Sequence, residues 1–73
     1  MSEPDVREIR RNIKLSQTEF ALAFGLELTT VRAWEQGLRR PNGPARMLMI
    51  LIDRIPDVVM AALRDSKPVV QKM

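Results

Sequence analysis

The residues between Ser16 and Gln36 constrain the fold more than any other part of this chain. Ser16 and Glu19 have the spacing of a capping box, in which each side chain bonds the backbone N–H of the other residue and so opens a helix. Gly25 then ends that helix, because glycine adopts the left-handed backbone of a helix C-terminus without steric cost. A second helical pattern begins almost at once. The sequence therefore predicts two short helices joined by a tight turn.

Apolar residues on both sides of this turn predict how the two helices pack. A steep crossing requires a small residue where the helices meet, and Ala21 satisfies that requirement. The large apolar residues recur at helical spacing and form one shared wedge. These residues are Phe20, Phe24, Leu26, Val31 and Trp34. Together the features indicate a helix-turn-helix over residues 17–36.

The composition excludes several other classes of protein. The chain of 73 residues fits one domain, and it has neither cysteine nor histidine, so it has no disulfide and lacks the commonest zinc ligands and general base. It also has no glycine-rich phosphate loop and no convincing pair of carboxylates, so we expect no enzyme, no cofactor and no metal. Its longest apolar run, residues 47–52, is far shorter than the ~20 residues that span a bilayer. We expect a soluble, cytoplasmic protein without a membrane partner.

Helical patterns predict an all-α fold, a compact bundle of about five short helices. Besides the helix between Ser16 and Gly25, the expected helices cover residues 4–13, 28–36, 44–54 and 56–64. The domain is expected to span residues 1–64, with 65–73 as a flexible C-terminal tail. The segment 44–54 is apolar nearly all round. We assign to the core one apolar face that runs to the residue after it, Leu48, Leu51, Ile52 and Ile55.

Basic residues gather on both sides of the helix-turn-helix. The net charge is +3, and eight of the twelve lysines and arginines fall in two clusters. Such clustering fits a surface that binds a polyanion. The clusters are Arg7, Arg10, Arg11 and Lys14 before the motif, and Arg32, Arg39, Arg40 and Arg46 around its end.

Two stretches of sequence carry a resemblance to a known family. Leu-Ser-Gln-Thr-Glu-Phe-Ala at residues 15–21, Gly25, and Val-Arg-Ala-Trp-Glu-Gln-Gly at 31–37 resemble the phage-repressor-like (Cro/C1, or XRE) helix-turn-helix family, over about residues 5–64. The continuation Arg-Arg-Pro-Asn-Gly-Pro-Ala at 39–45 looks more narrowly like HigA-type antitoxins. The resemblance implies a lambda-repressor-like domain that binds a double-stranded DNA operator and represses transcription.

The narrower resemblance implies the antitoxin of a type II toxin–antitoxin pair. Such a protein represses its own operon and neutralises a ribonuclease-type toxin, like RelE or HigB. The alternative is a stand-alone phage-like or chromosomal regulator without a toxin partner. A further alternative is a protein-binding module in which contact with DNA is incidental.

Residues near the start of the second helix are expected to read base edges in the major groove. Arg32 has the guanidinium that pairs with guanine O6 and N7, and methyl groups meet the methyl of thymine. An arginine or threonine on a helix surface is otherwise only solvated or capping, and this alternative stays open. The expected base-reading residues are Leu28, Thr29, Thr30, Arg32 and Ala33.

Contacts with phosphates are expected from three places. Gln17 begins the first of the two helices, where the family places a glutamine against the DNA backbone; the alternative is an ordinary polar residue at a helix start. Arg46 lies in the first turn of a helix and opposes its dipole unless a phosphate docks there. The loop between the expected helices 28–36 and 44–54 contributes Arg39, Arg40 and Asn42.

Two acidic residues of the motif have expected structural roles. The resemblance implies that Glu35 pairs with Arg10 on the first helix. Glu27 occupies the N-cap of the second helix of the motif, where the family usually has serine or threonine. A carboxylate there caps backbone donors but repels phosphates.

A symmetric homodimer is expected, because one short helix makes too few contacts for strong discrimination and the family binds two half-sites. The apolar residues left over after the core was assigned are expected to form the contact between the two copies. The alternative is that they pack against a toxin or only against the helix 56–64. They are Met47, Ile50, Val59 and Met60.

Overall fold

The computed structural model describes residues 4–65, and within that range the chain forms five α-helices and no strand. They are α1 (Val6–Asn12), α2 (Gln17–Phe24), α3 (Leu28–Glu35), α4 (Pro44–Arg54) and α5 (Pro56–Asp65). The predicted all-α bundle and all five predicted helices are therefore confirmed, with ends shifted by at most two residues. The tail expected at 65–73 lies outside the described residues, apart from Asp65, which ends α5.

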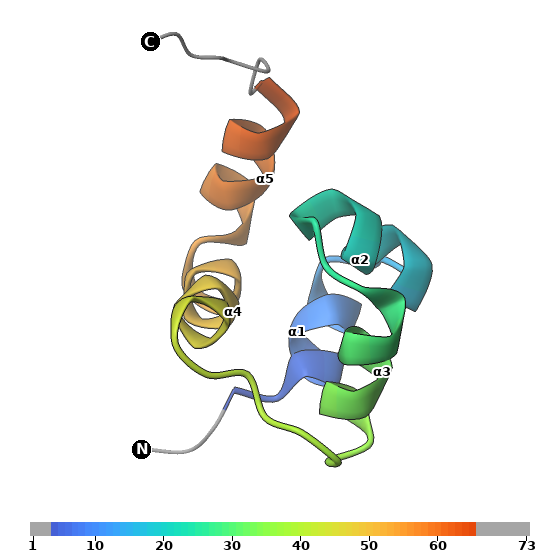
Figure 1. Ribbon diagram of the computed structural model, residues 1–73. Helices are drawn as coiled ribbons and strands as arrows, with labels where there is room; N and C mark the ends of the chain where they lie inside the picture. The colour runs from blue at the N-terminus through green and yellow to red at the C-terminus, as the bar shows by residue number, and fades with distance from the viewer. Residues whose placement is uncertain (1–3, 66–73) are drawn as a thin grey trace, which may run out of the picture.

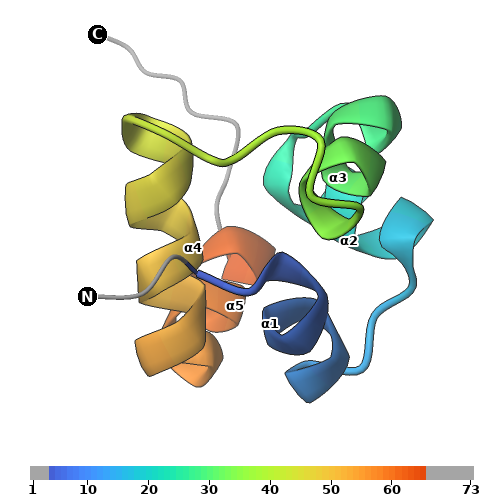
Figure 2. The ribbon, with the colours of Figure 1, turned by 90° about the horizontal axis from the view of Figure 1, so that it is seen from below.

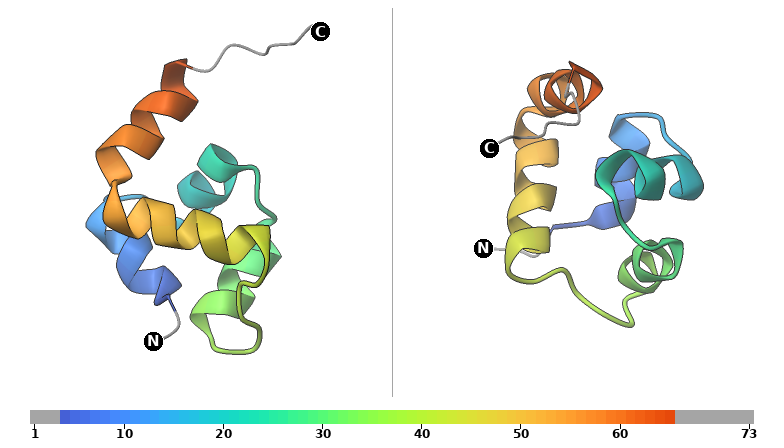
Figure 3. Two further views of the ribbon diagram at one scale, coloured as in Figure 1. Left: turned by 90° about the vertical axis from the view of Figure 1, so that its left-hand side faces the viewer. Right: turned by 45° about the horizontal axis from the view of Figure 1, so that its top comes forward.

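Figure 1 shows α1, α2 and α3 as one group, with α4 lying beside it and α5 extending beyond. α2 packs on α3, while α1 contacts both α3 and α4, and α5 packs on α4. Figure 3 shows α4 crossing in front of α1 and α3, and Figure 2 shows the segment between α3 and α4 bridging the two halves of the bundle. No helix within residues 4–65 is long and apolar enough to cross a membrane.

Local signals open and close α2 as predicted. The Ser16 hydroxyl accepts a hydrogen bond from the Glu19 backbone N–H at 3.0 Å, and the Ser16 N–H donates to the Glu19 carboxylate at 2.9 Å. Gly25 ends the helix with φ 67°, and the next N–H, of Leu26, donates to the Ala21 carbonyl at 2.8 Å. This bond satisfies one of the carbonyls that a helix end leaves free. The capping box and the glycine stop are both confirmed.

The core forms where α1, α2, α3 and α4 meet. Its fully or nearly fully buried residues are Val6, Ile9, Phe20, Ala21, Val31, Met49 and Ile52. Phe24, Leu26 and Trp34 pack against this cluster, as the predicted wedge requires, and the rings of Phe20 and Phe24 meet edge to face at 4.9 Å. Burial of this apolar surface is the main source of stability in a domain that has no cysteine to form disulfides.

The face of α4 that enters the core differs from the prediction. Ile52 is buried and Leu48 packs on the core, but Met49 replaces Leu51 and Ile55, which are 46% and 43% exposed. The assignment of those two residues to the core is therefore wrong. A helix that is apolar nearly all round has no periodicity that marks one face, so its orientation is set by the elements that it packs against.

Candidate nucleic-acid interface

The carboxylate of Glu35 ties three helices together. Its side chain is 1% exposed, and Arg10 on α1 approaches it with Nε at 2.6 Å from Oε2 and Nη2 at 3.0 Å from Oε1. Gln17 on α2 donates from Nε2 to Oε1 at 3.1 Å, and Arg7 lies at 3.5 Å. Arg10 also donates to the Leu15 carbonyl at 2.8 Å. The predicted pair of Arg10 and Glu35 is confirmed and holds α3 against α1, while the bond from Gln17 holds α3 against α2.

Burial and hydrogen bonding act in opposite directions on the pKa of Glu35. Burial alone disfavours the charged carboxylate, but the hydrogen bonds from Arg10, Gln17 and Arg7 and the charge of Arg10 outweigh it, so the pKa lies below its ordinary value. The hydrogen bond with the same carboxylate raises the pKa of Arg10, against a smaller effect of burial. The pair is therefore ionised, and α3 is positioned by charged hydrogen bonds.

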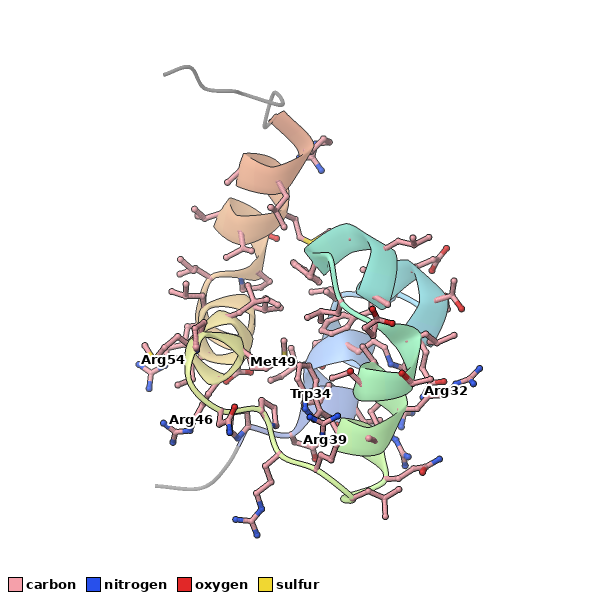
Figure 4. All side chains as sticks on the ribbon, in the orientation of Figure 1. Arg32, Trp34, Arg39, Arg46, Met49 and Arg54 are labelled. Carbon is pink, nitrogen blue, oxygen red and sulfur yellow. The ribbon has the colours of Figure 1, made fainter. Side chains whose placement is uncertain are left out.

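α3 turns one polar face outward. Thr29 and Arg32 are exposed, and Thr30 and Ala33 are half-buried, whereas Val31 is fully buried. Figure 4 shows the Arg32 side chain extending from α3 away from the body of the protein. The position of Leu28 differs from the prediction, because its side chain packs against the core. A thymine contact by Leu28 thus loses its geometric support, while the base contacts of the other four residues stay predictions.

The side chain of Gln17 is engaged within the protein. One N–H of its carboxamide donates to Glu35, which leaves the second N–H and the carbonyl oxygen for another partner. The sequence indicated a polar residue at the start of α2 but gave no sign of this bond, because eighteen positions separate Gln17 from Glu35. Contact between Gln17 and a phosphate stays a prediction.

The remaining predicted phosphate contacts lie in two places. Arg39, Arg40 and Asn42 are exposed in the segment between α3 and α4, which is anchored by the buried Pro41. Arg46 instead extends from α4, on the opposite side of the molecule from Arg32 (Figure 4). The structure therefore does not bring Arg46 to the face that carries Arg32, and its phosphate contact also stays a prediction.

One further expectation, a capping role for the carboxylate of Glu27, is wrong. Glu27 is the N-cap residue of α3, but its carboxylate makes no capping hydrogen bond.

Among the four residues predicted for a dimer contact, Met47 is 55% exposed, whereas Val59 packs against the core. Ile50 and Met60 are half-buried. Whether these residues meet a second copy stays a prediction.

These features define a class of protein. Two short helices joined at Gly25, with the second one stapled to the bundle by Glu35 and exposing a polar face, form a helix-turn-helix DNA-binding fold. A family model described as HTH_3, helix-turn-helix, matches residues 6–44, which is more than half of the chain. The chain belongs to this family of DNA-binding regulators. No match was found among curated proteins or among solved structures.

Proposed function

We propose that this protein is a transcriptional repressor that binds a two-fold symmetric operator sequence as a homodimer. The observation that carries the proposal is the outward face of α3, where Arg32 and Thr29 are exposed while Val31 beneath them is buried. The bonds to Glu35 fix this helix before DNA arrives, so little conformational entropy is lost on binding. In this arrangement α3 enters the major groove and the start of α2 approaches the backbone.

The outer surface of α4 and α5 supports the dimer. Met47 and Leu51 are one turn apart on α4, Ile55 follows the end of that helix, and Val58 lies in the first turn of α5; their exposures are 55%, 46%, 43% and 61%. We call these four residues the apolar row. Rows of exposed apolar residues with polar neighbours are typical of protein–protein contacts. Met47 belongs both to the row and to the contact predicted from the sequence, whose other residues, Ile50, Val59 and Met60, are half-buried.

Charges beside the apolar row favour a second copy of this chain as its partner. Arg54 on α4 and Asp57 on α5 are exposed, and neither forms an ion pair with any other residue in the described range 4–65. Around a two-fold axis each residue meets the other copy's surface, so one patch that carries both charges complements itself. A two-fold dimer also matches the symmetry of paired half-sites.

A more specific proposal is that the repressor is the antitoxin of a toxin–antitoxin pair. It is supported by the resemblance of residues 31–37 and 39–45 to HigA-type antitoxins. A toxin would compete for the same kind of apolar surface as the second copy. The two alternatives differ in one measurement. The measurement is co-expression with the product of an adjacent reading frame, followed by size-exclusion chromatography. A toxin partner should elute with this protein as a stable hetero-complex. A stand-alone repressor should elute as a homodimer without the second protein.

Selection of bound duplexes from a random pool tests the proposed function. The wild-type protein is expected to enrich a palindromic motif with a conserved guanine in each half-site. Arg32→Ala should lose that guanine and about 1–3 kcal/mol of affinity for the selected site, but much less for random DNA. Equal losses on both DNAs, with an unchanged motif, would assign Arg32 to phosphate. A pool without any enriched motif would contradict the proposed function.

A further inference from the structure

Glu27 differs from the residues that begin the first two helices. Asp5 and Ser16 accept hydrogen bonds from the third helical N–H of α1 and α2, at 3.1 and 3.0 Å. Glu27 has the same extended backbone before α3, yet its carboxylate accepts no such bond. It is exposed and forms no ion pair with any residue between 4 and 65. At the start of α3, the Glu27 carboxylate therefore has neither a capping hydrogen bond nor an ion pair within residues 4–65.

A free carboxylate at this position is costly beside DNA unless it finds a hydrogen-bond donor. Phosphates repel it, and no cation of the described chain neutralises it. The major groove offers donors on only two bases, the N4 amino group of cytosine and the N6 amino group of adenine. In adenine the acceptor N7 lies next to the amino group and repels a carboxylate, whereas cytosine has no acceptor beside N4. Guanine and thymine present only acceptors at their hydrogen-bonding positions.

We propose that Glu27 is a specificity-determining residue, whose carboxylate accepts a hydrogen bond from the N4 amino group of a cytosine in each half-site. This inference rests on the proposed function, since it requires α3 to lie in the major groove. It assigns a second base to this helix, besides the guanine expected for Arg32. The discrimination against other bases at that position is expected to be on the order of tenfold.

A purely structural role makes a different prediction. A negative charge near a helix N-terminus stabilises the helix through its dipole, without any contact with DNA. Two variants separate the roles. Glu27→Ser replaces the carboxylate with a side chain that caps the helix, and Glu27→Gln keeps the length but presents an amide, which pairs with adenine N6 and N7.

The experiment is selection from a random pool with wild type, Glu27→Ser and Glu27→Gln, at one salt concentration. The wild type should enrich cytosine at one position of each half-site, Glu27→Ser should lose only that preference, and Glu27→Gln should shift it to adenine. Glu27→Ser should also bind random DNA several-fold more tightly, because a repulsive charge is removed. Glu8→Gln, which removes an exposed carboxylate from α1, is the matched control and should leave every base preference in place.

Base frequencies that are identical in the three proteins would overturn the inference, even if affinity rises in both Glu27 variants. The guanine that depends on Arg32 distinguishes a failure of this inference from a failure of the proposed function. If it persists while no cytosine depends on Glu27, the inference fails and the proposed function stands. If the wild type enriches no motif at all, the proposed function fails and the role of Glu27 fails with it.

Discussion

The guanidinium of Arg10 on α1 donates two hydrogen bonds, of 2.6 and 3.0 Å, to the carboxylate of Glu35 on α3. Both side chains are largely withdrawn from water, at 15% and 1% exposure. The pair holds the last residue of α3 against the first helix of the bundle. Its loss should therefore affect the whole fold as well as the interface.

Arg10→Met should destabilise the protein by about 3–5 kcal/mol, because it leaves the Glu35 carboxylate buried without its main partner. The double variant Arg10→Met/Glu35→Leu should recover most of this loss, since it removes both charges. Urea unfolding followed by circular dichroism measures both. A double variant no more stable than Arg10→Met would show that the pair itself stabilises the fold.

Stability should fall as the pH is lowered past the ordinary pKa of 4.5 for a glutamate. The pKa of Glu35 is lower in the folded state, so its contribution is complete above that pH and disappears as the pH falls through the folded-state pKa. Urea midpoints between about pH 6 and pH 2.5 measure this dependence. Arg10→Met/Glu35→Leu should lose less stability over the same range; an equal loss would assign it to other carboxylates.

The left-handed residues on either side of α2 should respond in opposite directions. Gly25 has φ 67° and open space where a Cβ would lie, so Gly25→Ala should cost about 1 kcal/mol through backbone conformation alone. Lys14 has φ 62° although it is not a glycine. Lys14→Gly should relieve that strain and stabilise the fold by less than ~1 kcal/mol. Thermal unfolding that shows two losses would contradict the argument for Lys14.

Arg39 and Arg64 offer a matched test of the electrostatic contact. Figure 4 shows Arg39 beside Trp34, near the end of α3, whereas Arg64 is exposed on α5, which extends away from α3 (Figure 1). Arg39→Ala should lower the slope of log K against log salt by about 0.9, because one phosphate contact is lost, and should weaken all sequences alike. Arg64→Ala should leave the slope unchanged. Fluorescence anisotropy on random duplex DNA measures both slopes, and equal effects would contradict the assigned face.

Leu51→Glu should convert the proposed dimer to a monomer, because it places a charge in the middle of the apolar row. The fold should persist, since Leu51 is already 46% exposed. Leu22→Glu is the matched control, as Leu22 is 78% exposed but lies on α2, away from the row. Sedimentation velocity separates the outcomes. A wild-type protein that stays monomeric with and without operator DNA would exclude the dimer.

The sequence by itself determined the local features of this protein. The capping box at Ser16, the stop at Gly25 and the proline at the start of α4 act within a few residues, so their effects follow from neighbouring positions alone. The spacing of Phe20, Ala21 and Val31 likewise placed them in the core, because α2 and α3 each have one apolar face. The helix-turn-helix and its outward residues Thr29 and Arg32 followed from that assignment.

Only the tertiary structure decided which way α4 turns and which polar side chains meet. Met49 faces the core and Leu51 faces outward because α1 and α5 fix the rotation of a helix that is apolar on nearly every side. Gln17 binds Glu35 because α2 crosses α3, and nothing in the chain between them signals the bond. Glu27 stands where a capping residue is expected, yet its carboxylate stays uncommitted, because an N-cap position permits that hydrogen bond without requiring it.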